Sequence, residues 1–206
     1  MNTSVKVSEQ KHSDYTGAKL GIWLFLLTEL ILFGGVFLLY SVYRSKNPED
    51  FHNAAEELSI VIGTLNTIIL ITSSFTMAIS ISAIQKENKK LSAISLFLTI
   101  VLGFAFLVNK YFEWGEKIHH GIYPNSPELL KQSKGENLFY GLYYVMTGLH
   151  GLHVIIGIIL LSVMLILVKR EKINSTNFVK LENSGLYWHL VDIIWIFLFP
   201  LFYLIT

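Results

Sequence analysis

The 206-residue sequence contains no cysteine, and charged residues make up only 15% of it. Without cysteine, a disulfide framework, a thiolate metal site and a cysteine-held iron–sulfur cluster are all excluded. An ordinary soluble domain carries about 25% charged residues, so this chain is poor in charge. Its net charge of +1 argues against a nucleic-acid partner held by a broad basic surface. With so few charged residues, the arrangement of the apolar residues decides the class of protein.

These apolar residues, 52% of the chain, lie in five long blocks. A bilayer core of about 30 Å requires about 20 mostly apolar helical residues to cross it. The blocks lack the alternating pattern of a membrane β-barrel, so we expect helices. The prediction is an all-α integral membrane protein, a bundle of five transmembrane helices. Residues 1–19 form a polar tail, residues 20–206 form one membrane domain, and the predicted spans cover about 20–43, 58–84, 91–114, 138–168 and 186–205.

Lysine and arginine are unevenly distributed between the two sides of this predicted bundle. The N-terminal tail and the second and fourth loops hold ten of them, and the opposite side holds six. Cytoplasmic loops carry the excess of Lys and Arg in most membrane proteins. We therefore expect the N-terminus in the cytoplasm and the C-terminus outside.

One carboxyl group interrupts the first span. An ionisable group in hydrocarbon costs at least about 2.5–3.5 kcal/mol on insertion scales, so it requires a compensating role. Glu29 lies about 14 Å into the span at the helical rise of 1.5 Å per residue. It is either a proton-linked or lipid-headgroup site, or a carboxylic acid hydrogen-bonded to another helix. The sequence leaves both interpretations open.

The fourth and fifth spans carry pairs of polar residues one helical turn apart. His150 and His153 form one pair, for which a hydrogen-bonding role is favoured over metal binding because no carboxylate lies on that span. His189 and Asp192 form the second, and we expect them to pair with each other. A short loop joins these spans, so a polar cluster of His153, His189 and Asp192 is a further hypothesis.

Polar residues also mark the second and third spans. At the outer end of the third, Lys110 and Glu113 are spaced for an ion pair beside Trp114, which predicts an anchor at the membrane interface. The second span is rich in Ser and Thr, which predicts hydrogen bonds between helices, with a hydrophilic pore lining as the alternative. Only three of the seven histidines lie in spans, too few to ligate two haems. No phosphate loop, nucleophile elbow or zinc motif is present, so the chain is predicted to carry no catalytic, cofactor-binding or metal-binding residue.

Four motifs, in order, resemble the cytochrome c oxidase subunit III family. They are GIWLFLLTE at 21–29, LNTIILITSS at 65–74, TGLHGLHV at 147–154 and YWHLVDIIW at 187–195. The resemblance implies the short, five-span bacterial form of an accessory subunit in a haem-copper terminal oxidase that reduces oxygen and moves protons. It implies that haem and copper are held by partner subunits. It also implies that the chain packs on the catalytic haem-copper subunit I, contacts other oxidase subunits, binds phospholipid and supports proton uptake.

The resemblance favours a cytochrome c oxidase in the bacterial cytoplasmic membrane, with a respiratory supercomplex as a further assembly. A quinol oxidase subunit III and a nitric oxide reductase accessory subunit are the alternatives. A stand-alone ion channel or transporter is the third interpretation, although inverted repeats and broken helices typical of transporters are not evident.

Overall fold

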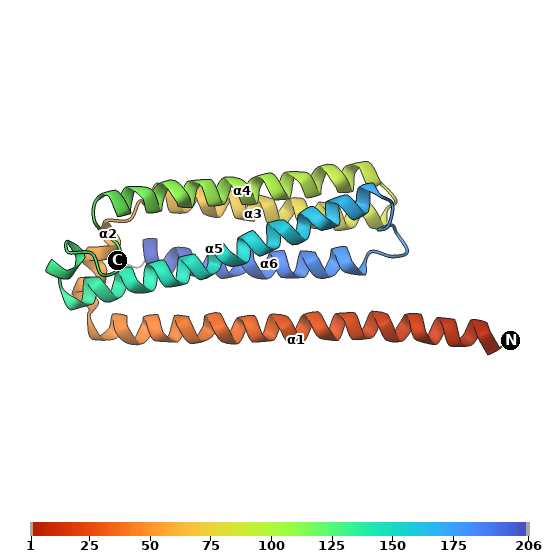
Figure 1. Ribbon diagram of the computed structural model, residues 1–206, viewed down its shortest axis with the longest axis horizontal. Coiled ribbons are helices and arrows are strands. Elements are labelled where there is room, and N and C mark those ends of the chain that lie inside the picture. Colours follow the sequence, from red (N-terminus) through yellow and green to blue (C-terminus); the bar gives the residue numbers. More distant parts are fainter. Residues whose placement is uncertain (1, 205–206) are drawn as a thin grey trace.

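The computed structural model describes the backbone of residues 2–204 and the side chains of residues 16–204, and its regular structure in that range is helical (Figure 1). In chain order the elements are α1 (Asn2–Lys46), α2 (Pro48–Glu56), α3 (Ile60–Gln85), α4 (Lys89–His119), the 3₁₀ turn η1 (Leu129–Lys131), α5 (Lys134–Lys169), α6 (Val179–Phe199) and the π-helical turn η2 (Pro200–Leu204). Five of the helices are long and apolar enough to cross a membrane, which confirms the predicted number of spans.

Four of the long helices form a bundle, and the first lies along its side. α3 packs against α4 and α6, and α5 packs against the same two helices. α1 runs beside α5 and α6 (Figure 1). Its buried apolar residues are Leu26, Phe33 and Tyr40, spaced by seven, so one narrow stripe of α1 contacts the bundle. The N-terminal end of α1 lies at the same end of the molecule as the α3–α4 turn and the α5–α6 loop.

Hydroxyl and amide groups join α3 to α4 inside the bundle. The Thr76 and Thr99 hydroxyls lie 2.8 Å apart, and the Asn109 amide donates to Asn66 Oδ1 at 3.0 Å. Thr76, Thr99 and Asn66 are buried. The polar residues of the second span therefore include hydrogen-bonding partners between helices, as the favoured interpretation predicted.

Four helices extend well beyond the predicted spans. α1 begins at Asn2, within the predicted polar tail, α4 continues to His119, α5 begins at Lys134 and α6 begins at Val179. The start of α5 is fixed by a capping box, in which the Ser133 hydroxyl and the Glu136 carboxylate each accept the other's backbone N–H at 3.1 Å. Hydropathy marks only the part of a helix inside hydrocarbon, so a helix can continue past its predicted span.

A short helix, α2, lies where the sequence analysis expected only a loop. Pro48 occupies its first turn, followed by two acidic residues, which is the usual signature of a helix start. Phe51 of this helix is buried between the rings of Tyr40 and Phe139, with centroid distances of 5.4 and 5.5 Å. α2 thus closes one end of the bundle, between α1 and α5.

Candidate functional site

The carboxyl group of Glu29 meets a histidine of the fourth span. His153 Nε2 lies 3.0 Å from Glu29 Oε2, and both side chains are largely shielded. His153 Nδ1 lies 2.8 Å from the carbonyl of Leu149, which only accepts, so Nδ1 carries a hydrogen. When the ring is neutral, Nε2 is therefore an acceptor and Glu29 must supply the proton; otherwise the pair is ionic. Glu29 and His153 thus share one proton between α1 and α5.

His150, one turn from His153, lies in an aromatic environment. Its ring centroid is 5.4 Å from that of Phe106 and 5.3 Å from that of Trp195. Neither ring nitrogen has a hydrogen-bond partner among the described residues. His150 therefore contributes to packing at the centre of the bundle.

The predicted ion pair of Lys110 and Glu113 is present, with Lys110 Nζ 3.1 Å from Glu113 Oε2. The two residues are only 7% and 4% exposed, so the pair lies inside the bundle. Lys110 also donates to the hydroxyls of Tyr143 and Tyr203, at 3.0 and 3.1 Å. Both tyrosines in turn donate to Glu113 Oε1. The pair is a closed polar centre inside the bundle, and its two tyrosine partners were not identified from the sequence.

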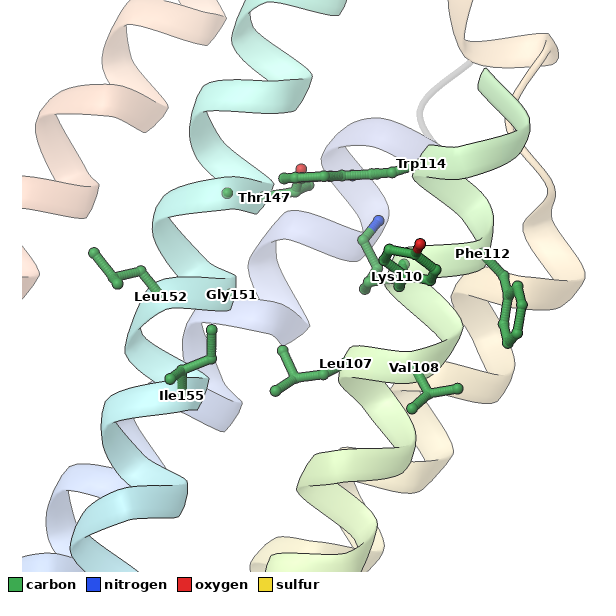
Figure 2. Close-up of a pocket in the computed structure, with 11 residues that line it drawn as sticks. Leu107, Val108, Lys110, Phe112, Trp114, Thr147, Gly151, Leu152 and Ile155 are labelled. Atoms are coloured by element: carbon green, nitrogen blue, oxygen red, sulfur yellow. The ribbon is translucent and has the colours of Figure 1, made fainter. Parts of the chain in front are cut away.

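Trp114 covers one end of a groove between α4 and α5, near the C-terminus of α4. Figure 2 shows its ring extending from α4 towards α5, above Leu107 and Ile155. The groove has a volume of about 780 Å³ and mostly apolar walls. Gly148 permits the close approach, because a Cβ there would lie 3.2 Å from the tryptophan ring. The indole N–H has no acceptor among the described residues.

The predicted contact between His189 and Asp192 is wrong. The His189 ring bonds instead to Ser74 of α3, with Nδ1 2.6 Å from Oγ. Asp192 is 2% exposed, and neither of its carboxyl oxygens has a partner among the described residues. The hypothesis of one cluster with His153 is wrong too, because His153 bonds to Glu29 on α1. Spacing along one helix identified the polar residues, but the partner of each was decided by the helix that packs against it.

The described part of the chain holds no group of three or more His, Cys, Asp or Glu side chains arranged to bind a metal ion. The five buried polar residues predicted from the sequence lie in three separate places. Glu29 and His153 join α1 to α5, His150 lies among aromatic rings, and His189 and Asp192 lie between α3 and α6.

Comparison with known proteins gives a consistent family. A sequence model described as cytochrome c oxidase subunit III matches residues 8–206. The chain is 30% identical over 209 aligned residues to the probable quinol oxidase subunit 3 of Staphylococcus saprophyticus, covering all of this chain and 97% of that protein. It is 32% identical over 197 residues to the cytochrome c oxidase subunit 3 of Thermostichus vulcanus, covering 95% and 90% of the two chains.

A further relative is the cytochrome c oxidase subunit 3 of Synechocystis, which is 35% identical over 186 residues, covering 90% of this chain and 74% of that protein. The match extends over all five spans and agrees with the four motifs found in the sequence. The chain therefore belongs to the cytochrome c oxidase subunit III family, whose members are subunits of haem-copper oxidase complexes.

Proposed function

We propose that this chain is an accessory subunit of a cytochrome c oxidase in the bacterial cytoplasmic membrane, where it packs on catalytic subunit I. Haem and copper are held by the partner subunits. The observation that carries this proposal is that the buried ionisable residues Glu29, Lys110 and Glu113 have partners inside this chain, and the described residues hold no ligand set for a metal. The arrangement suits a protein that supports a neighbour's chemistry.

The Glu29–His153 pair supports a role in proton supply. It lies at the junction of α1 with the bundle, and its side chains are 14% and 10% exposed. One proton is held between a carboxyl group and an imidazole, an arrangement that suits a proton relay. We propose that this pair helps to sustain proton uptake by the catalytic subunit.

The groove between α4 and α5 supports phospholipid binding. Its walls are apolar, and the unpaired indole N–H of Trp114 lies at its outer end. Trp114 is five residues from the end of α4, about 8 Å by helical rise, a depth where lipid ester carbonyls offer acceptors. We propose that one acyl chain occupies the groove and that an ester carbonyl accepts from Trp114.

Purification of the affinity-tagged chain in mild detergent tests the proposed function. Co-elution of a haem-containing subunit is the expected result. A colourless, monodisperse chain that conducts ions in liposomes would contradict it.

The same preparation distinguishes the electron donors. Oxidation of reduced cytochrome c, together with a dinuclear copper site in a partner subunit, supports the cytochrome c type. Oxidation of quinol without that copper site would instead assign the complex to the quinol type, whose name one of the relatives carries.

A further inference from the structure

A second groove lies between α3 and α6, with a volume of about 390 Å³. Its polar residues are Ser74, His189 and Asp192. Ser74 and His189 bond to each other, which leaves the carboxyl group of Asp192 as the unsatisfied group of the groove. Ser74 lies within hydrogen-bonding reach of that carboxyl, but it bonds to His189 and is not aligned with either carboxyl oxygen.

This unsatisfied carboxyl lies at the middle of the membrane. Asp192 follows the start of α6 by thirteen residues, about 20 Å at the helical rise. Ser74 lies fourteen residues into α3, about 21 Å from its start. A hydrocarbon core is about 30 Å thick, so lipid headgroups at either surface are too far away to reach Asp192. A donor must therefore come from a group that is itself inside the membrane.

Large apolar side chains surround the groove. Ile71, Phe75 and Ile196 are 51%, 66% and 44% exposed, so they present an open apolar face. Lipid chains can cover such a face, but they carry no N–H or O–H group. A buried polar group left without a partner costs several kcal/mol in hydrocarbon. A transmembrane helix can cover the apolar side chains around the groove, and a donor near its middle can form a hydrogen bond with the carboxyl.

We propose that the α3–α6 groove is the docking surface for a transmembrane helix of the catalytic subunit, which presents an N–H or O–H donor to Asp192. This inference rests on the proposed function, and it adds the face and the residue through which the subunits meet. The α4–α5 groove differs, because Lys110 at its wall already has three partners and its unpaired Trp114 lies near the outer surface.

Site-specific cross-linking in the whole oxidase complex tests this assignment. The chain has no native cysteine, so one introduced thiol defines the position of a benzophenone-maleimide probe. Ile196→Cys places the probe at the α3–α6 groove. Val108→Cys, on the α4–α5 groove, is a matched control because both residues are 44% exposed.

We expect the Ile196→Cys probe to cross-link to the catalytic subunit and the Val108→Cys probe not to. Cross-links from Ile196→Cys only to lipid or to a second copy would overturn the docking assignment, and so would cross-links to the catalytic subunit from Val108→Cys alone. In those cases the complex still co-purifies, so the proposed function stands. If the unmodified chain brings down no haem-containing subunit, the proposed function fails and the docking surface fails with it.

A substitution separates docking from internal stability. Asp192→Leu is expected to leave the thermal unfolding of the isolated subunit unchanged or to raise its midpoint, because Asp192 has no aligned hydrogen-bond partner among the described residues. The same change should weaken association with the catalytic subunit by about 3- to 20-fold, the range for one hydrogen bond between membrane helices. Unfolding of the isolated subunit, or unchanged association, would contradict the docking role.

Discussion

Three charged or chargeable residues inside this protein differ in how they are compensated. Glu29 has one partner, a histidine on another span. Lys110 has three, a carboxylate and two tyrosine hydroxyls. Asp192 has none among the described residues. A polar group in hydrocarbon requires either a partner or a function. We therefore expect the three residues to have different roles.

The shared proton of Glu29 and His153 gives the first prediction. Glu29→Gln should leave assembly and thermal stability unchanged, because the Gln amide can donate to His153 Nε2. Turnover coupled to proton movement should fall modestly, because an amide does not exchange that proton. The measurements are complex yield, the unfolding midpoint and proton pumping in vesicles.

Glu29→Leu is the comparison for this prediction. It removes the hydrogen bond to His153 altogether and should destabilise the isolated subunit by about 1 kcal/mol. If Glu29→Gln abolishes assembly, Glu29 is chiefly structural and the role in proton supply is wrong.

The buried ion pair gives the second prediction. Glu113→Leu leaves the Lys110 charge buried and deprives the Tyr143 and Tyr203 hydroxyls of their acceptor. We expect a loss of about 3–5 kcal/mol in unfolding free energy, as for other buried pairs that lose one partner. Lys110→Met combined with Glu113→Leu should recover part of the loss, because no charge remains buried. Thermal or denaturant unfolding of the two variants and the unmodified chain checks this.

An exposed ion pair provides the control. Lys89 Nζ lies 3.0 Å from Glu171 Oε1, with side chains 43% and 72% exposed. Lys89→Met should change the unfolding free energy by less than about 1 kcal/mol. If Lys89→Met and Glu113→Leu lower the unfolding free energy equally, burial does not determine how much these ion pairs contribute to stability.

At the scale of the elements, one tryptophan sets how closely three helices approach α6. Trp188 is fully buried, and its indole N–H donates to Ser73 of α3 at 3.1 Å. Gly103 of α4 and Gly157 of α5 lie against its ring, and a Cβ at either glycine would lie 2.7 Å from a ring carbon. Small residues at both positions therefore permit the close packing of the bundle.

The third prediction follows from this contact. Gly157→Ala should lower the unfolding free energy by about 1–3 kcal/mol, because the added methyl group forces the fully buried ring to move. Gly141→Ala, on the same helix, is the control, since a Cβ there meets no atom within 4 Å. That change should be neutral or stabilising by up to about 1 kcal/mol. A lower unfolding midpoint for Gly157→Ala than for Gly141→Ala would show that packing against Trp188 outweighs helix propensity at position 157. Equal midpoints would contradict this prediction.

The sequence predicted the five spans well, because the length and polarity needed to cross hydrocarbon are local properties. It also identified Glu29, Lys110 and Glu113 as residues that require compensation. It did not identify Tyr203 as a partner of Lys110, because the two are 93 residues apart and meet only through helix packing. The false pairing of His189 with its neighbour on α6 has the same origin.

At the scale of the whole molecule, α1 is joined to the bundle at three heights. Lys19 pairs with Glu182 near one end, Glu29 with His153 in the middle, and the Tyr40 hydroxyl donates to the Leu201 carbonyl near the other end. Most of the apolar surface of α1 is exposed to its surroundings. The four-helix bundle is therefore expected to fold without α1, whereas the position of α1 depends on these contacts and on its buried stripe of Leu26, Phe33 and Tyr40.

The orientation in the membrane gives the last prediction, which follows from the excess of Lys and Arg at one end. The α5–α6 loop lies at that end, and the loop before α5 lies at the other (Figure 1). In the cysteine-free chain, a membrane-impermeant maleimide should label Leu130→Cys, which is 65% exposed, on intact cells whose outer membrane is absent or opened. It should label Asn177→Cys, an exposed loop residue, only after the cytoplasmic membrane is permeabilised. The reverse pattern would place the N-terminus outside, and the positively charged loops would then have to be held there by a partner subunit.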